Sequence, residues 1–354
     1  MRMYTDPKGT AYKELIKYAI QRTSRFMLGV GGYSTSFGDD FEYIQPPPPA
    51  LLDRLQPYLL EVRRVTQEEV LAAIENEEIP SLLDHGMSGA GEFYYYRCCE
   101  ASGQILAEAV HGLYDWCSPL PEDLTFLNED GTLFLGSVAH ERMGILIVEH
   151  SEGRELMSRI PGLFLELPEH KEFDCYLDDA IRHQTDWLEI QGYGLTELPV
   201  RIRELEQLKN LSVFEQDLDR LPSGLFELTG LETLSIMSAE LVEIPREIGS
   251  LKQLRELRIY GGSSDRPTPS WHPRPKEELP LRSLPAEIGE LSRLEYLDIA
   301  YSGIRELPPE LERLQNLKSL TIANSLMDKK PNFLQRMKSL EYVSISTNPF
   351  GIGD

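Results

Sequence analysis

The sequence predicts two domains, an α+β domain over residues 1–180 and a solenoid of short parallel strands over residues 181–354. Three observations support this prediction. Leucines recur every 23 residues in the C-terminal half, prolines recur there with the same step, and the N-terminal half carries mixed helix-like and strand-like apolar patterns instead. A fixed step of this length indicates stacked repeats, because a single repeat cannot bury its own leucines.

The repeat is clearest from Leu234 to Leu257. Its landmark position recurs at Leu188, Leu211, Leu234, Leu257, Leu297, Leu320 and Val343, and its prolines are Pro199, Pro222, Pro245, Pro285, Pro308 and Pro331. Apolar and polar residues alternate in Leu234-Ser-Ile236, which predicts a short strand that buries both apolar side chains. Proline then ends the strand, so an irregular or short helical segment returns the chain to the next strand.

This Leu-x-x-Leu-x-Leu pattern resembles the leucine-rich repeat family, and its Leu-Pro-x-x-Ile-x-x-Leu form is similar to the intracellular and bacterial members. The resemblance covers about residues 185–350. It implies a horseshoe with a parallel β-sheet on the concave face and short helical or irregular turns on the convex face, a shape that binds another protein. Where the family has a buried asparagine after each strand, this sequence has Tyr193, Gln216, Ala239, Gly262, Ser302, Ser325 and Asn348. We therefore expect these bends to use serine, water or looser geometry.

One step of the repeat is 40 residues long, between Leu257 and Leu297. The 17 extra residues fall within 261–280, a stretch rich in Pro, Gly and Ser that includes Trp271. Such a segment cannot form a core, so we expect a projecting loop between two strands that remain neighbours. The loop is either functional or an idle insertion.

The N-terminal domain is predicted to begin with helices and to continue with an antiparallel sheet, an order typical of the α+β class. Apolar residues at helical spacing predict helices over residues 8–28, 51–64, 67–77 and 104–114, the third opened by Thr66 and Glu69 as a capping box. A hairpin is expected where Asn128–Gly131 joins the β-prone segments 124–127 and 132–136. Residues 144–148 are apolar on both faces, which favours a central strand.

Three motifs in this domain are similar to catalytic or phosphate-binding signatures, and each lacks an essential part. His140-Glu141 is followed by Gly144 where a zinc-protease helix needs its second histidine. Gly29–Gly38 follows a predicted helix instead of a strand, and no predicted strand precedes Gly86–Ala90. The sequence therefore predicts no catalytic, cofactor-binding or metal-binding residue.

The junction between the domains is expected at residues 176–186. Thr185 takes the position that leucine fills before the later strands, so repeat sequence does not fully cover the first strand at Leu188. A solenoid needs a cap at each end. We expect the segment Phe164–Ile181 to pack there.

The net charge is −23, with −16 in residues 1–184 and −7 in residues 185–354. This charge repels nucleic acid and anionic membrane surfaces, so neither is expected as a partner. The sequence has no apolar run near the ~20 residues of a membrane span and no secretion signal at its start, which predicts a cytoplasmic protein. The adjacent Cys98 and Cys99 are expected as buried thiols, not as a disulfide or a zinc site.

Two columns of residues face outward in the predicted register of the strands. One holds Gln191, Phe214, Met237, Tyr260, Ala300, Ala323 and Ser346, and the other holds Glu189, Ser212, Ser235, Arg258, Asp298, Thr321 and Ser344, with Glu215, Ser238, Tyr301 and Asn324 beside them. Aromatic, methionine and arginine side chains are enriched at interface hot spots. We predict a partner-binding patch on the concave face made of Phe214, Met237, Arg258, Tyr260, Tyr301 and Trp271. Alternatively, the loop or the N-terminal domain covers this patch within the molecule.

Two functions remain open at this point. The sequence favours a non-enzymatic interaction module that binds a protein partner through the concave face. The alternative is that the N-terminal domain is an enzyme or a toxin-neutralising, immunity-like domain that the repeats direct to its target. Fold alone does not decide between them, and the sequence predicts neither the partner's identity nor the oligomeric state.

Overall fold

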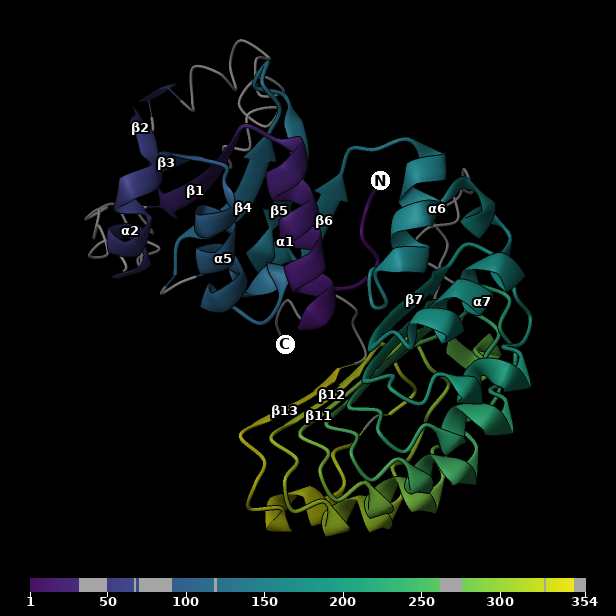
Figure 1. Ribbon diagram of the computed structural model, residues 1–354. Coiled ribbons are helices and arrows are strands. Elements are labelled where there is room, and N and C mark those ends of the chain that lie inside the picture. The colour runs from purple at the N-terminus through teal and green to yellow at the C-terminus, as the bar shows by residue number, and fades with distance from the viewer. Residues whose placement is uncertain are drawn as a thin grey trace. The chain divides into compact units, whose positions relative to one another are not determined.

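The computed structural model describes residues 1–31, 50–66, 68–69, 91–117, 120–261, 276–327 and 329–346. Its contacts divide the chain into two compact units, Met1–Pro168 and Glu169–Asp354, whose ribbons are drawn in Figure 1. The division falls before helix α7 (Phe173–His183), whereas the sequence placed the boundary after residue 180. None of the described helices is long and apolar enough to cross a membrane.

The first unit contains an antiparallel sheet of six strands within the described ranges, in the order β2-β3-β1-β4-β5-β6. Its strands are β1 (Arg25–Gly31), β2 (Leu59–Val65), β3 (Gly91–Arg97), β4 (Glu122–Leu127), β5 (Leu133–Val138) and β6 (Met143–Leu146). Its helices are α1 (Thr10–Arg22), α2 (Ala50–Leu55), α5 (Glu100–Ala109) and α6 (His150–Arg159). This arrangement confirms the predicted α+β class.

Aromatic side chains hold the centre of the first unit together. Phe26 on β1 is fully buried, with its ring centroid 5.2 Å from that of Tyr96 on β3 and 5.7 Å from that of Phe126 on β4. Helix α1 is fixed by Tyr12, whose buried hydroxyl donates to the carbonyl of Leu106 on α5 at 2.9 Å. Burial raises the pKa of Tyr12, so its hydroxyl keeps the proton that this hydrogen bond uses.

Three expectations for the first unit were wrong. The helix expected over residues 8–28 ends at Arg22, and the chain then forms β1, so Gly29 and Gly31 lie in a strand and do not follow a helix. The helix expected over 51–64 is α2 followed by strand β2. Residues 144–148 are not central, because β6 is at the edge of the sheet and Ile145 is 43% exposed. A short apolar run fits a buried helix and a buried strand equally well, which explains the first error.

Other local predictions were confirmed. Strands β4 and β5 form the expected antiparallel hairpin, with Phe126 paired to Leu135. The capping box is present, because the Glu69 N–H donates to Thr66 Oγ1 at 3.3 Å and the Thr66 N–H donates to Glu69 Oε2 at 2.8 Å. The helix expected over 104–114 is α5 followed by the 3-10 helix η2 (Leu113–Asp115). Most of the helix expected over 67–77 and nearly all of Gly86–Gly91 lie outside the described residues.

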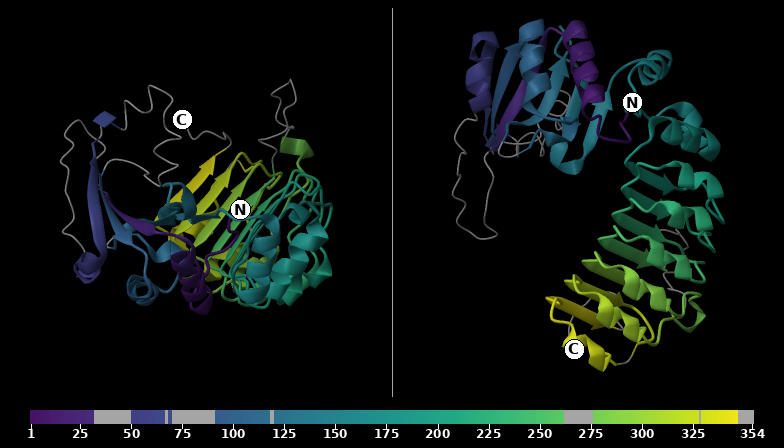
Figure 2. Two further views of the ribbon diagram at one scale, coloured as in Figure 1. Left: turned by 45° about the horizontal axis from the view of Figure 1, so that its top comes forward. Right: turned by 60° about the horizontal axis from the view of Figure 1, so that its bottom comes forward.

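The second unit is a stack of parallel strands in which short 3-10 helices on the opposite side of the repeat connect one strand to the next (Figure 2). The strands are β7 (Trp187–Gln191), β8 (Asn210–Phe214), β9 (Thr233–Met237), β10 (Glu256–Tyr260), β11 (Tyr296–Ala300), β12 (Ser319–Ala323) and β13 (Tyr342–Ser346). The turns are η5 (Val200–Glu204), η6 (Ser223–Glu227), η7 (Arg246–Ser250), η8 (Lys276–Glu278), η9 (Ala286–Glu290), η10 (Pro309–Arg313) and η11 (Asn332–Arg336).

Six of the seven landmark residues are fully or almost fully buried, as predicted: Leu188, Leu211, Leu234, Leu257, Leu297 and Leu320. Val343 was expected to be buried as well, but it is only half-buried. It lies on β13, which has a partner strand on one side only within the described residues. The core of the solenoid therefore weakens toward its last strand.

The long step of the repeat does not interrupt the sheet. Strands β10 and β11 pair in register, with Leu257 opposite Leu297, as predicted. The chain leaves β10 at Gly261, whose N–H donates to the carbonyl of Ala300 at 2.9 Å. A Cβ atom at this glycine would lie 2.2 Å from the carbonyl oxygen of Tyr301, so only glycine fits there. Residues 262–275, including Trp271, lie outside the described residues.

Helix α7 caps the first strand of the solenoid. The hydroxyl of Tyr176 donates to the carbonyl of Glu189 on β7 at 2.9 Å, and its ring stacks on that of Tyr193 at a centroid distance of 5.8 Å. The cap is shorter at its start than the expected segment Phe164–Ile181, because the Phe164 carbonyl accepts the N–H of Tyr4 inside the first unit. It is also longer at its end, since α7 continues to His183.

Candidate functional site

Three columns of side chains line the face of the seven-stranded sheet that points away from the solenoid core. In the strands from β7 to β12 the second and fourth residues are buried, so the first, third and fifth residues make up this concave face, although Ser235 and Ala300, which were expected to face outward, are buried as well. The sequence analysis named the columns of third and fifth residues. It missed the first residues, although the same alternation includes them: Trp187, Asn210, Thr233, Glu256, Tyr296, Ser319 and Tyr342.

The fifth residues of three neighbouring strands form a continuous apolar strip. Met237 on β9 pairs with Phe214 on β8 and with Tyr260 on β10. All three side chains are half-exposed. Neighbouring strands are about 4.8 Å apart, so these side chains follow one another along the concave face. We call Phe214, Met237 and Tyr260 the aromatic strip.

Charged groups lie beside the aromatic strip. The Tyr260 hydroxyl donates to Asp298 Oδ2 on β11 at 2.6 Å. The pKa of Tyr260 is raised, mainly by partial burial and to a smaller extent by this hydrogen bond. Arg258 is exposed on β10 and pairs with Glu256 two residues earlier on the same strand. Arg258 also lies in register with Asp298 on the neighbouring strand. The structure therefore brings two carboxylates and one guanidinium together next to Tyr260.

The remaining residues of the predicted patch are Tyr301 and Trp271. Tyr301 directly follows β11 and is half-exposed, with a left-handed backbone at φ 56° and its N–H donating to the carbonyl of Ala323 at 3.0 Å. Its main chain thus begins the bend of the repeat. Trp271 falls outside the described residues, so its place relative to the aromatic strip stays a prediction.

Three residues expected beside the outward columns are in fact buried: Glu215, Ser238 and Asn324. Glu215 is 2% exposed, and its carboxylate accepts the N–H groups of Tyr193 at 2.7 Å, Gly194 at 2.9 Å and Leu195 at 3.2 Å in the preceding repeat. Its side chain therefore turns into the bend, where main-chain donors need an acceptor.

Serine satisfies two other bends of the solenoid, at Ser238 and at the expected position Ser325, whereas the buried hydroxyl of Ser302, also at an expected position, has no hydrogen-bond partner within the described residues. Ser238 donates to the carbonyl of Leu218 at 2.6 Å and accepts the N–H of Glu240 at 3.1 Å. Ser325 accepts the N–H of Met327 at 3.2 Å. A hydroxyl can donate and accept at once, so one serine joins backbone groups of two repeats.

A row of alternating charges precedes the strands, and the sequence analysis missed it. The residue before each strand is, in order, Asp186, Lys209, Glu232, Arg255, Glu295, Lys318 and Glu341. Lys209 pairs with Glu232 at 3.2 Å, and Glu295 pairs with Arg255 and with Lys318, each at 2.5 Å. Hydrogen bonds from Lys318 and Arg255 hold the pKa of Glu295 below its ordinary value. These pairs form a charged rim along one border of the concave face.

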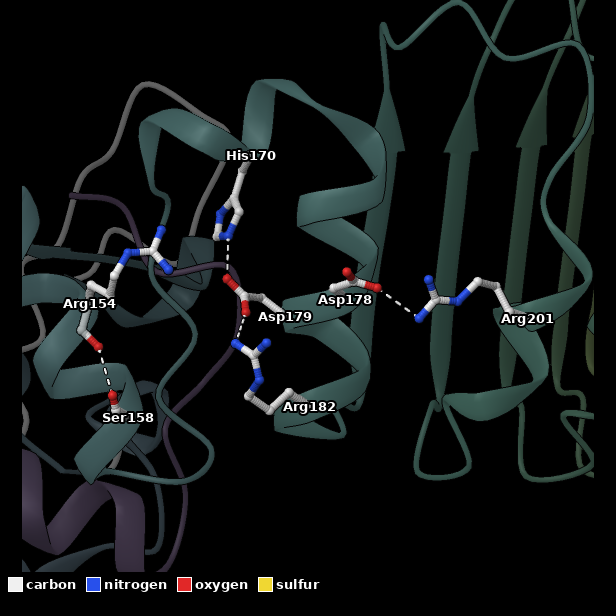
Figure 3. Close-up of polar contacts among 7 residues, drawn as sticks. All are labelled: Arg154, Ser158, His170, Asp178, Asp179, Arg182 and Arg201. Atoms are coloured by element: carbon white, nitrogen blue, oxygen red, sulfur yellow. Dashed lines mark hydrogen bonds and ion pairs between the residues drawn. The ribbon is translucent and has the colours of Figure 1, made fainter.

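The cap of the solenoid contains a buried ionic cluster (Figure 3). Asp179 on α7 is 5% exposed, and its Oδ2 lies 3.0 Å from Nε2 of His170, which is 3% exposed. The other carboxylate oxygen pairs with Arg182 one turn later on α7. Asp178 points the opposite way and pairs with Arg201 on η5 at 2.7 Å. The contacts with His170 and Arg201 hold α7 in place within the second unit, so the cluster stabilises the cap.

Potential metal ligands meet at one place in the first unit. Ligand atoms of Glu122, Asp123 and His140 lie within 4.8 Å of one another. Asp123 is 4% exposed, but its Oδ1 already accepts the N–H of Ala139 at 3.1 Å, while His140 is exposed and lies 3.8 Å from Glu141. The hydroxyl of Tyr94 on β3 donates to Glu92 on the same strand at 2.9 Å. This arrangement gives no reason to assign a metal or a reaction.

No family model and no curated protein matches this sequence. Among solved structures, the chain is similar to the leucine-rich repeat domain of the type III effector XopL, with 27% identity over 56% of this chain and a TM-score of 0.41. It is also similar to a leucine-rich repeat protein of Leptospira interrogans (26% identity, 46% of this chain, TM-score 0.35) and to InlJ of Listeria monocytogenes (20%, 48%, 0.34). The similarity covers 64%, 38% and 32% of those three chains, less than two thirds of each.

Proposed function

Residues 187–346 form a leucine-rich repeat solenoid, and we propose that its concave face binds a protein partner. The observation that carries this proposal is the aromatic strip. Phe214, Met237 and Tyr260 lie side by side on β8, β9 and β10 and are half-exposed. Contiguous exposed side chains of these types, with a polar border, mark interaction surfaces in soluble proteins.

The rest of the concave face suits the same role. Trp187 is half-exposed on β7, and Tyr296 and Tyr342 are 45% and 58% exposed on β11 and β13. Tyrosine and tryptophan offer a large rigid contact area at a small cost in side-chain entropy. The charged rim follows one border of these aromatic residues. An apolar centre with a polar border is the usual composition of a protein interface.

The roles of individual residues follow from their positions. In this proposal Phe214, Met237 and Tyr260 supply the apolar contact, and Arg258 supplies a charged contact beside them. Tyr301 extends the surface past β11. Trp271 would add a contact at the border, because the insertion begins directly after Gly261.

The test replaces two residues of the strip together, Phe214→Ser with Tyr260→Ser. A matched control is Val200→Ser with Val242→Ser, because these valines are 49% and 56% exposed and lie outside the strands. Full-length wild type and both variants are used to capture partners from a lysate of the native cell, and their melting temperatures are measured. We expect the strip variant to lose a captured protein that wild type and control retain, with a melting temperature only a few degrees below theirs because the hydrogen bond from Tyr260 to Asp298 is lost.

Two results would contradict the proposal. If the strip variant captures the same proteins as wild type but melts well below the control, the strip is internal packing. If both variants lose the same partner, the loss reflects surface apolarity in general, and the concave face has no special role.

A further inference from the structure

We infer that the concave face recognises a cationic side chain of its partner at Asp298, with arginine favoured over lysine; this inference rests on the proposed function. Asp298 is the third residue of β11 and is half-exposed at the end of the aromatic strip. A carboxylate in this place gives the surface a charge preference that the apolar strip alone does not have. The partner class it selects is a protein that presents a basic residue next to an apolar one.

The carboxylate of Asp298 is held in one orientation but is not saturated. Its Oδ2 accepts the Tyr260 hydroxyl at 2.6 Å, and this is its only hydrogen bond within the described residues. Each carboxylate oxygen can accept more than one hydrogen bond, so Oδ1 remains available to a partner. Because Tyr260 already fixes the group, a ligand would lose less free energy in ordering it.

The local charges favour a cation. Arg258 is the cross-strand neighbour of Asp298, yet its ion pair is with Glu256. Glu256 and Asp298 thus carry two negative charges beside the single positive charge of Arg258, which leaves a local net charge of about −1. The next strand adds no charge on this face, since β12 presents Ser319, Thr321 and Ala323 there. Complementary charge of this kind guides a basic partner to the surface and penalises an acidic one.

The neighbouring side chains leave room and supply an aromatic face. Ala300 and Thr321 lie next to Asp298, on its own strand and on β12 respectively, and both are short. Tyr296 is two residues earlier on β11, on the same face, and is 45% exposed. A guanidinium is planar, stacks on aromatic rings and donates parallel hydrogen bonds to a carboxylate. An ammonium group makes only the charge contact, so arginine should bind more tightly than lysine.

The test is a selection of random linear peptides displayed on phage against four full-length proteins: wild type, Asp298→Asn, the double variant Phe214→Ser with Tyr260→Ser, and Glu306→Gln. Asparagine keeps an oxygen that can accept the Tyr260 hydroxyl, so this variant removes the charge while preserving the internal contact. Glu306 is an exposed acid in the loop after β11 and serves as the matched control for a lost negative charge. Melting temperatures verify that each variant is folded.

We expect wild type and Glu306→Gln to enrich peptides that share a basic residue, mostly arginine, beside an apolar one. For an enriched peptide, Asp298→Asn should weaken binding about tenfold or more, as the loss of a charge-assisted hydrogen bond does. Replacing the basic residue of the peptide by glutamine should cost a similar factor on wild type and much less on Asp298→Asn. Such a double-mutant cycle shows that the two groups contact each other.

The remaining outcomes separate this inference from the proposed function. Peptides that lack a shared basic residue, bind Asp298→Asn as well as wild type and fail to bind the Phe214/Tyr260 variant would overturn the inference and support the concave face as a binding surface. Peptides that bind all four proteins equally, or no enrichment on wild type, would count against both.

Discussion

The hydroxyl of Tyr260 on β10 donates a hydrogen bond of 2.6 Å to Asp298 on β11, across the place where the chain inserts 17 extra residues. This contact joins the aromatic strip to the carboxylate at the third position of β11. Tyr260 and Asp298 are 38 residues apart in sequence, so their hydrogen bond also links the strands on either side of the insertion. The same pair thus supports the sheet and shapes the proposed binding surface.

Tyr260→Phe should lower the free energy of unfolding by about 0.5–1.5 kcal/mol, the usual net contribution of one hydrogen bond. The control is Tyr296→Phe, because the Tyr296 hydroxyl makes no hydrogen bond within the described residues and its loss should change stability little. Urea unfolding of both variants measures the difference. Equal destabilisation by the two changes would show that the contact with Asp298 adds nothing.

Leu234→Ala should cost about 2–5 kcal/mol, because it removes a fully buried side chain and leaves a cavity between repeats. Val343→Ala removes fewer atoms from a half-buried position at the last strand and should cost clearly less. Denaturant unfolding of the two variants tests this gradient along the solenoid. A larger loss at Val343 than at Leu234 would mean that the last repeat is better covered than the described residues indicate.

Glu215→Gln should destabilise the second unit by about 1–3 kcal/mol, the cost of leaving buried donors without a partner. Glutamine has one acceptor oxygen in place of two, and its amide would face the N–H groups of Tyr193, Gly194 and Leu195. Glu243→Gln is the control, since Glu243 is an exposed acid in the next repeat. The account of this bend fails if both substitutions have the same small effect on the unfolding midpoint.

These results mark where sequence reasoning succeeded and where it did not. The step from Leu234 to Leu257 determined the register of every strand, because burying one side of a strand leaves no choice for its neighbours. The direction of Glu215 could not be read in the same way, since a carboxylate at the end of a strand is usually solvated, and its burial is explained by the three N–H groups of the preceding bend that donate to it. The strands β1 and β2 were mistaken for helix because short apolar runs lack a decisive period.

The candidate site was predictable in part because the repeat determines which strand residues face outward. Phe214, Met237 and Tyr260 are neighbours because the repeat aligns them. The sequence analysis overlooked three aromatic residues that the same alternation of buried and outward positions places on the concave face. They are the first residues of their strands: Trp187, Tyr296 and Tyr342. The alternating rim from Asp186 to Glu341 was also present in the sequence, but its ion pairs depend on side-chain directions that the repeat pattern does not give.

Acid should weaken the fold partly through His183 at the end of α7. Burial is the main cause that lowers the pKa of His183, and Asp179 opposes the shift. As the pH falls through about 6.5, the unfolded chain takes up the proton first, so the free energy of unfolding decreases until the pH reaches the lower pKa of the folded state. His183→Gln should reduce this loss between about pH 7 and pH 5. A variant with the same pH dependence as wild type would show that other groups cause it.

The central claim is that a partner lies against the aromatic strip, and site-specific photo-crosslinking tests it most directly. Benzoylphenylalanine replaces Met237 in the middle of the strip or, as the control, Arg246, which is exposed at the start of η7 on the opposite side of the same repeat region. Irradiation in the cells that make the protein is followed by mass analysis of the products. The account predicts an adduct with a second protein from position 237 and none from position 246. Adducts from position 237 that join only segments of this chain, or a partner adduct from position 246 alone, would contradict it.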